Sequence, residues 1–227
     1  MRWNWLLIIG VWLFPMSTFE KLTELFGAFP GIGPRQAKRF VYFLLTKNKT
    51  SLDELTKLIS SLPKEIAQCK DCFRYFGGRG SATLCSLCAD PNRGTGELMV
   101  VAKDTDLEAM EKSGTYHGRY FVLGGTISLI ERKNADKLRL KELLSLIESR
   151  VHPRVSASSN QRESASLKEV ILALSANPDG EHTSDELKRL LSPTGVKITT
   201  LGRGLSTGSE LEYADAETLK SALENRG

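Results

Sequence analysis

Apolar residues recur along the chain with two different periods, and the change of period divides the sequence. Between residues 19 and 62 they recur every three or four positions, the spacing that places side chains on one face of a helix. From residue 97 onward, short continuous apolar runs alternate with helix-like segments. Buried parallel strands carry such runs, because both of their faces are covered. The pattern therefore predicts a helical N-terminal part followed by an α/β part.

Three helices are predicted in the first part. One runs from Phe19 to Phe29, and the next begins at Pro34, since proline is tolerated in a first helical turn. The apolar stripe of this second helix consists of Ala37, Phe40, Val41, Leu44 and Leu45. The third helix spans residues 51–62, where Ser51 and Glu54 have the spacing of a capping box. Its leucines are expected to complete a small helical core with the other two.

The second part alternates strands with helices. Strands are predicted at 98–102, 120–123, 170–174 and 196–201, and helices at 104–113, 138–147 and 184–191, the last capped by Ser184. This order predicts an α/β fold with a doubly wound, mostly parallel sheet, whose ligands bind at the carboxyl ends of the strands. Residues 152–166 predict an exposed polar loop, and residues 211–213 and 218–223 a final short strand and helix.

All four cysteines lie between these parts, in the sequence CKDCFRYFGGRGSATLCSLC. Two C-x2-C pairs separated by twelve residues are typical of a structural site in which four thiolates hold one Zn²⁺ tetrahedrally. The candidate ligands are Cys69, Cys72, Cys85 and Cys88. Two disulfides, which need an oxidising compartment, or four unrelated buried thiols are the alternatives. Four protein ligands leave no open position, so this metal is expected to be structural and not catalytic.

The sequence P-G-I-G-P joins the first two helices and is typical of a helix-hairpin-helix. Gly31 and Gly33 would let backbone N–H groups approach a phosphate, and the N-terminus of the second helix is positive. Arg35, Lys38 and Arg39 follow and lie off the apolar stripe, where the arginines would add charge-assisted contacts. Such contacts bind DNA without reading its sequence. The alternative is a plain helical hairpin with a glycine turn.

The distribution of charge is consistent with this interpretation. The chain has a formal net charge of +4. Residues 17–93 carry 12 Lys and Arg against 7 Asp and Glu, whereas residues 94–227 carry 18 against 20. A basic front and a slightly acidic back favour nucleic acid as the partner of the front, with ordinary surface charge as the alternative.

The first residues form a separate apolar segment. Trp3 to Phe14 is uncharged but too short to span a bilayer as a helix. It resembles the apolar region of a signal peptide, but no small-x-small cleavage pattern follows it. Helical periodicity begins directly after Met16, which favours Met16 as the natural start. Residues 1–15 are therefore expected to be an extra or non-native extension, and no membrane association is expected.

Several stretches together resemble the RecR family of bacterial recombination mediators. They are LFGAFPGIGPRQAKRF, CKDC…CSLC, GRYFVLGG and GLSTGSELEYADAETLKSAL, and the resemblance covers residues 17–227. It implies a helix-hairpin-helix domain at 17–67 and a four-cysteine zinc finger at 68–93. A Toprim-like domain, the module of topoisomerases and primases, follows at 94–192, and a C-terminal oligomerisation segment at 193–227.

The resemblance also implies a function. Family members are non-enzymatic proteins of DNA repair and recombination in the cytoplasm, associated with the nucleoid. They form homo-oligomeric rings of two or four subunits, bind DNA, and act with RecO and RecF to load RecA at single-strand gaps. Arg35 and Arg39 match the DNA-contacting positions of that family, and the four cysteines match its zinc ligands. Asp179 and Glu181 match the acidic pair after the third strand.

One position departs from catalytic Toprim domains. These place a glutamate at the end of the first strand as general acid and base, and Ala102 stands there in this chain. Asp179 and Glu181 alone would hold Mg²⁺ weakly through water, or form a solvated loop or partner-facing acidic patch, which is preferred. A metal-dependent Toprim enzyme, such as a small primase or nuclease, is the second hypothesis. A generic zinc-containing DNA adaptor is the third. The chain has no G-x-x-x-x-G-K-[ST] sequence, so no phosphate-binding loop of that kind is expected.

Overall fold

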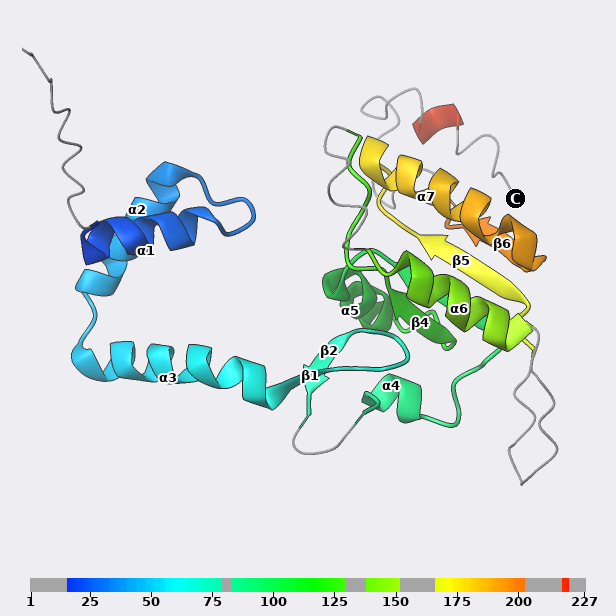
Figure 1. Ribbon diagram of the computed structural model, residues 1–227, viewed down its shortest axis with the longest axis horizontal. Helices are drawn as coiled ribbons and strands as arrows, with labels where there is room; N and C mark the ends of the chain where they lie inside the picture. Colours follow the sequence, from blue (N-terminus) through cyan, green and yellow to red (C-terminus); the bar gives the residue numbers. More distant parts are fainter. Residues whose placement is uncertain (1–15, 79–82, 130–137, 152–165, 203–217, 221–227) are drawn as a thin grey trace, which may run out of the picture. The chain divides into compact units, whose positions relative to one another are not determined.

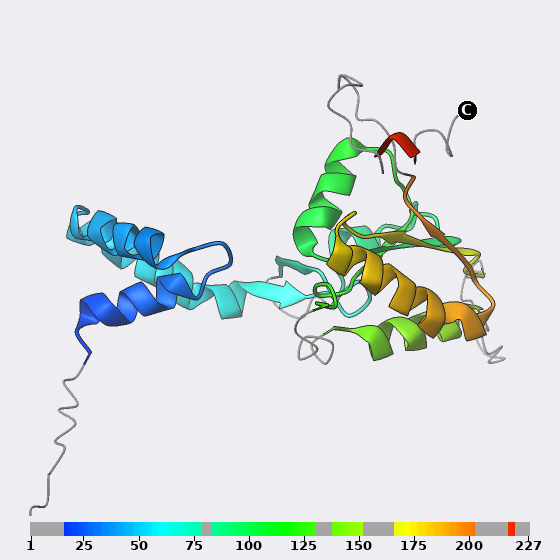
Figure 2. The ribbon, with the colours of Figure 1, turned by 90° about the horizontal axis from the view of Figure 1, so that it is seen from above.

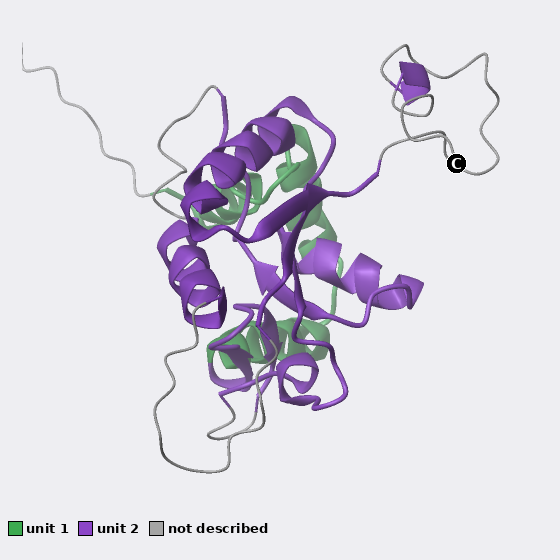
Figure 3. Cartoon of the chain, turned by 90° about the vertical axis from the view of Figure 1, so that its right-hand side faces the viewer, with its two compact units in different colours: residues 1–63 green, residues 64–227 purple. Residues whose placement is uncertain are grey.

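The chain divides into two compact units, residues 1–63 and residues 64–227 (Figure 3). The computed structural model describes residues 16–78, 83–129, 138–151, 166–202 and 218–220. Residues 218–220 are helical, as predicted. The expectations for residues 1–15, for the polar loop after residue 151, for the strand at 211–213 and for the rest of the final helix fall outside the described residues.

The first unit is built on a pair of helices, α1 (Thr18–Gly27) and α2 (Pro34–Leu45), which pack against each other (Figure 1). The rings of Phe26 and Phe40 join them edge to face, with centroids 5.8 Å apart. The buried residues of α2 are Ala37 and Val41, two members of the predicted apolar stripe. The two predicted helices and the glycine turn between them are confirmed.

Helix α3 (Lys49–Glu65) differs from its prediction in two ways. It begins before Ser51, because Asn48 Oδ1 accepts a hydrogen bond from the Ser51 N–H at 2.9 Å, so the predicted capping box is wrong. No residue of α3 is buried, and Leu58 and Ile59 are 56% and 58% exposed. The expected helical core that includes α3 is therefore wrong as well: its apolar face is open.

A four-stranded parallel sheet forms the centre of the second unit. The strands are β3 (Glu97–Val101), β4 (Arg119–Val122), β5 (Glu169–Ala173) and β6 (Lys197–Thr200), in the order β4-β3-β5-β6. In the register of the sheet, Val100 lies opposite Phe121 on one side and Leu172 on the other. The predicted parallel sheet is confirmed, and each strand lies within one or two residues of its predicted bounds.

Helices cover both faces of this sheet, as a doubly wound fold requires (Figures 1 and 2). Helix α5 (Asp104–Ser113) packs on the face that carries Met99 and Val101. Helices α6 (Leu140–Val151) and α7 (Pro178–Leu191) pack on the opposite face, and a short 3-10 helix, η2 (Ser192–Thr194), continues α7. Because successive residues of a strand point to opposite faces, β3 contributes to two separate apolar clusters.

Helix α7 begins six residues before its predicted start at Ser184. Asn177 is its N-cap, and the Asn177 side chain accepts a hydrogen bond from the Gly180 N–H at 2.8 Å. Ser184 is buried inside the helix and donates to the Gly180 carbonyl, so the predicted cap is wrong. An asparagine followed directly by proline is a helix-start signal that the sequence carried.

Two further strands and one helix lie between the helical and α/β parts. Strands β1 (Ile66–Gln68) and β2 (Tyr75–Gly77) pair antiparallel, and helix α4 (Ser86–Ala89) follows. None of the three was predicted. Across the described ranges, no helix has both the length and the apolar character needed to cross a lipid bilayer.

Candidate metal centre and nucleic-acid interface

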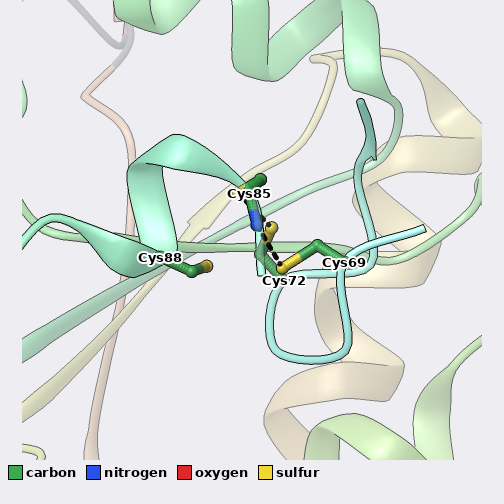
Figure 4. Close-up of side chains that lie close together, drawn as sticks. All are labelled: Cys69, Cys72, Cys85 and Cys88. Carbon is green, nitrogen blue, oxygen red and sulfur yellow. Dashed lines mark hydrogen bonds between the residues drawn. The ribbon is translucent and has the colours of Figure 1, made fainter. Parts of the chain in front are cut away.

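The four cysteines converge on one point, although they come from two separate turns (Figure 4). Cys69 and Cys72 lie between β1 and β2, whereas Cys85 is the N-cap of α4 and Cys88 lies within that helix. Their sulfur atoms all lie within 4.8 Å of one another. All four are free thiols, and three of them are buried. The spacing predicted this convergence, and the four cysteines are positioned to hold a metal ion.

Hydrogen bonds within the cluster favour negative charge on one sulfur atom, that of Cys85. The Cys85 N–H donates to Cys69 Sγ at 3.4 Å, and the sulfur atoms of Cys72 and Cys85 are 3.6 Å apart. Hydrogen bonds from Cys72 and Cys88 place the pKa of Cys85 well below its usual range, and the bond to Cys85 raises the pKa of Cys72. Thiols that already share protons suit a metal ion, because metal binding displaces those protons. The donor set therefore fits a thiophilic ion with tetrahedral geometry.

An unusual backbone conformation closes the first turn of the cluster. Phe73 follows Cys72 and has φ +62°, which is in the left-handed region that bulky residues rarely adopt. Its ring lies 5.2 Å from the ring of Phe121 and 5.5 Å from the guanidinium of Arg139. The packing of this ring against β4 and its neighbours offsets the backbone strain. The turn is thus held by the α/β part as well as by its own sequence.

The glycine turn of the first unit contains a left-handed residue and has open space around both of its glycines. Gly31 has φ +75°, and a Cβ at Gly31 or Gly33 would meet no atom within 4 Å. Gly33 is the N-cap of α2 and Pro34 occupies the first turn, with no side-chain hydrogen bond capping the helix among the described residues. Pro34 has no N–H, so the N–H groups of Arg35 and Gln36 are the ones that the first turn of α2 would offer to a ligand, and the helix dipole favours an anion there.

The predicted cations lie on the exposed side of the same helix. Arg35, Lys38 and Arg39 are all exposed, whereas Ala37 and Val41 between and beyond them are buried. The guanidinium of Arg39 donates to Gln36 Oε1 at 3.3 Å, a long hydrogen bond on the surface. The structure thus brings the two glycines and three cations together at the start of α2. Their contact with DNA stays a prediction.

The acidic pair lies in the first turn of α7 and not in a loop. Asp179 is half-buried, and its Oδ1 accepts a hydrogen bond from the Leu129 N–H at 3.0 Å. Thr183 Oγ1 accepts from the Ile127 N–H at 2.8 Å, so the segment after β4 is tied to α7 at two points. Asp179 therefore has a structural role at the carboxyl edge of the sheet. Glu181 is exposed.

Among the described residues, this edge of the sheet brings no third His, Cys, Asp or Glu ligand to the acidic pair. Ala102 is buried directly after β3, and its carbonyl accepts a hydrogen bond from the Gly124 N–H at 2.9 Å. Within the described parts of the chain, the four cysteines are the only group of three or more His, Cys, Asp or Glu side chains placed to hold a metal ion. Asp179 and Glu181 therefore gain no third side-chain ligand of these types there.

Comparison with known proteins agrees with this architecture. Three family models match the chain: "RecR, helix-hairpin-helix" at residues 19–62, "Toprim domain" at 96–202 and "RecR, C-terminal" at 204–226. The chain is 37% identical to "Recombination protein RecR" of Cereibacter sphaeroides over 207 residues, which is 91% of this chain and 94% of the relative.

Two further relatives carry the same name. The Acidothermus cellulolyticus protein is 37% identical over 92% of this chain and 96% of its own length. The Chloroflexus aurantiacus protein is 36% identical over 91% of this chain and 92% of its own length. With three family models matched along the chain and 37% identity over nearly the full length of both proteins, this chain belongs to the RecR family of recombination proteins.

Proposed function

We propose that this chain is a non-enzymatic, DNA-binding mediator of recombination and repair in the cytoplasm. In this proposal it acts with RecO and RecF to load RecA at single-strand gaps. One observation carries the DNA-binding role: the start of α2 combines an uncapped helix N-terminus, two glycines with open space around them, and three exposed cations. Backbone phosphate is the ligand that fits such a combination.

The carboxyl edge of the sheet supports the absence of catalysis. A Toprim enzyme needs carboxylates both to hold Mg²⁺ and to move a proton. Ala102 supplies none, and Asp179 already accepts a backbone hydrogen bond from Leu129. Incubation of the protein with Mg²⁺ and labelled DNA tests this directly. Cleavage or extension of the DNA that disappears in an Asp179→Asn variant would replace the proposal with an enzymatic one.

The metal that we assign to the four cysteines is a single structural Zn²⁺. Bound zinc would join the turn at Cys69 and Cys72 to the turn at Cys85 and Cys88, and it would leave no position for a substrate. Its role would be to cross-link these two segments of the chain. Elemental analysis of protein purified without chelators checks this assignment, and another metal, or none, would contradict it.

The open face of α3 supports assembly of several copies. Leu55, Leu58, Ile59 and Leu62 are each more than two-fifths exposed and share one helix. Contiguous exposed apolar residues mark interaction sites. A second copy of the chain is the occupant that we propose, with the C-terminal segment making the other contact, because a closed ring larger than a two-fold dimer needs two distinct interfaces. Basic hairpins of several subunits would then surround the DNA together.

A reconstituted loading reaction tests the mediator role. Filament formation by RecA on gapped DNA is measured with RecO and RecF present, with and without this protein. We expect faster filament formation with the wild-type chain and little acceleration with Arg35→Ala/Arg39→Ala. A Lys57→Ala variant, which removes an exposed cation of α3, is the control and should behave like wild type. Equal rates with and without the protein would contradict the mediator role.

A further inference from the structure

The cysteine cluster is attached to the α/β sheet through β4, which is an edge strand of that sheet. The Val122 N–H donates to the carbonyl of Cys72 at 2.8 Å, so the first cysteine turn covers part of the open edge. The Tyr75 N–H, just beyond that turn, donates to Asp104 Oδ1 at 2.8 Å. The first turn is therefore held through its own backbone, by one bond to the backbone of β4 and one to a side chain of α5.

The second cysteine turn is held differently, by a single side chain from the start of β4. One nitrogen of the Arg119 guanidinium, Nη1, donates to the carbonyls of Cys88 at 2.5 Å and Leu87 at 3.1 Å. The other, Nη2, donates to the carbonyl of Asp90 at 3.1 Å. All three carbonyls lie at the C-terminal end of α4, where a helix has no backbone donors left for them. Arg119 thus caps α4 from 31 residues away.

The chemistry of arginine suits this position. Its guanidinium is planar, always charged, and presents several donors in a fixed arrangement, whereas lysine offers one compact ammonium. Arg119 is half-buried, so its hydrogen bonds are partly shielded from water. Leu87 packs both against the cysteine cluster and against the apolar cluster of β3, β4 and α5. The Arg119 guanidinium therefore holds a turn whose leucine, Leu87, already packs against both clusters.

Electrostatics favours the same placement. Four thiolates around a divalent ion leave an excess of negative charge, which nearby cations stabilise. Arg119 brings one positive charge to the backbone of Cys88. Arg150 of α6 brings a second: its Nη2 lies 3.9 Å from Oδ2 of Asp71, one of the two residues between Cys69 and Cys72. Each cysteine turn therefore has one arginine of the α/β part beside it.

We propose that Arg119 is a positioning residue of the metal centre, which holds the second cysteine turn against β4 so that all four thiolates face one ion. This inference rests on the structural metal proposed above. It predicts that the stability of the metal complex depends on a side chain of the sheet that does not touch the metal. Partners of this kind around a metal site change metal affinity by about ten- to a hundredfold when removed.

The test measures release of zinc from the full-length protein to an excess of a chromogenic chelator. We expect Arg119→Met to release zinc about ten- to a hundredfold faster than wild type. Cobalt-loaded protein gives a second readout, because its thiolate-to-metal absorption reports the tetrahedral sulfur geometry. We expect this absorption to weaken or shift in Arg119→Met. Arg119→Lys keeps the charge but loses the three-way contact, so its release should also be faster than wild type.

Arg93→Met is the matched control. Arg93 is also half-buried, donates to the carbonyl of Gly118 at 2.8 Å, and pairs with Glu111 at 2.6 Å, but among the described residues it makes no hydrogen bond to the cysteine turns. Its loss should lower the melting temperature and leave zinc release unchanged. Wild-type release from folded Arg119→Met would overturn the proposal, as would equal acceleration by Arg93→Met.

A variant that keeps the charge covers the case in which Arg119→Met does not fold. Faster zinc release from Arg119→Lys than from wild type would then support the proposal, and wild-type release from Arg119→Lys would overturn it. A wild-type protein that binds no zinc and shows no cobalt absorption would instead defeat the metal assignment on which the proposal rests.

Discussion

The two units of the chain differ in how much apolar surface they bury for themselves. In the second unit, both faces of the sheet carry apolar clusters, with Phe121 and Val101 fully buried on opposite sides. In the first unit, Ala37 and Val41 are the only fully buried apolar residues among those described. Leu45 there is 72% exposed and Leu25 62% exposed. The second unit therefore gains stability from its own apolar core, whereas the described part of the first unit buries little apolar surface within itself.

This contrast indicates that the two units have different roles. Most of the stability of a helix in a protein comes from packing of its apolar face, and α3 leaves that face open. The second unit has its own core and, in our proposal, a metal ion that fixes its N-terminal edge. The first unit presents cations at one end and apolar side chains along α3, both of which need a partner. Stability should thus reside in the second unit and association in the first.

Loss of a metal ligand should have the largest effect and should fall on the second unit. In Cys72→Ser the cysteine turns cannot close around an ion, and metal-binding free energy is folding free energy in such sites, about 10 kcal/mol or more in zinc-finger peptides. We expect loss of bound zinc and a large drop in melting temperature. Ser86→Ala, in the same sequence segment but without a ligand, is the control. A Cys72→Ser protein with normal melting and normal zinc content would contradict the structural role.

A smaller destabilisation of the second unit is predicted for a substitution at Gly180. A Cβ there would lie 2.0 Å from the carbonyl oxygen of Ser175, which is backbone and cannot rotate away. Gly180→Ala should therefore shift the first turn of α7 and lower the free energy of unfolding by about 3 kcal/mol. Urea denaturation measures this change. Gly94→Ala, where the added Cβ meets no atom within 4 Å, should leave the free energy of unfolding nearly unchanged. Equal midpoints for the two variants would show that the contact relaxes freely.

Association should respond to the open face of α3. Burial of one leucine or isoleucine side chain contributes about 1.5–3 kcal/mol, so Leu58→Asp/Ile59→Asp should raise the dissociation constant of the assembly at least about a hundredfold. Light scattering over a range of concentrations measures this. Lys57→Asp changes the charge of an exposed side chain on the same helix without removing apolar surface, so it should assemble like wild type. An unchanged mass for the double variant would remove α3 from the interface.

The smallest effect is expected at the start of α1. Ser17 Oγ accepts from the Glu20 N–H, and the Glu20 carboxylate accepts from the Ser17 N–H, at 3.2 Å and 2.8 Å. Ser17→Ala should cost about 1 kcal/mol of stability in the first unit, measured by helix content during thermal melting. The hydrogen bonds from the N–H and Oγ–H of Ser17 lower the pKa of Glu20, so the part of the capping box that depends on the Glu20 carboxylate is present above pH 4.5 and is lost as the pH falls through the lower folded value. Unchanged helix stability in Ser17→Ala at neutral pH would contradict the capping box.

Much of this architecture could be predicted from local sequence. The cysteine spacing predicted the convergence of four thiols, and the apolar runs predicted the strands closely. Strands β1 and β2 were missed because three residues are too few to show a period. Asparagine is a preferred N-cap residue, so Asn48 and Asn177 could have been chosen as the helix starts in place of Ser51 and Ser184.

Other features could not be derived from one sequence. The amphipathic pattern of α3 shows that one face is apolar, but it does not show whether that face is covered by the same chain. The contacts of Arg119 depend on the meeting of β4 with a turn 31 residues earlier, and no local pattern encodes that meeting. Gly180 looked like part of a loop. That no Cβ fits at this position follows only from the position of the Ser175 carbonyl oxygen.

The central claim is that the first unit binds DNA phosphates through the start of α2, and a salt titration tests it most directly. Binding of fluorescent single- and double-stranded DNA is measured for wild type, for Arg35→Ala/Arg39→Ala, and for the control Lys57→Ala/Lys64→Ala, which removes two exposed cations from α3. We expect the arginine pair to weaken binding to all sequences alike. It should also flatten the slope of log K against log salt by about 1.4–1.8, the contribution of two phosphate contacts. The same slope in all three proteins, or equal losses in both double variants, would contradict the claim.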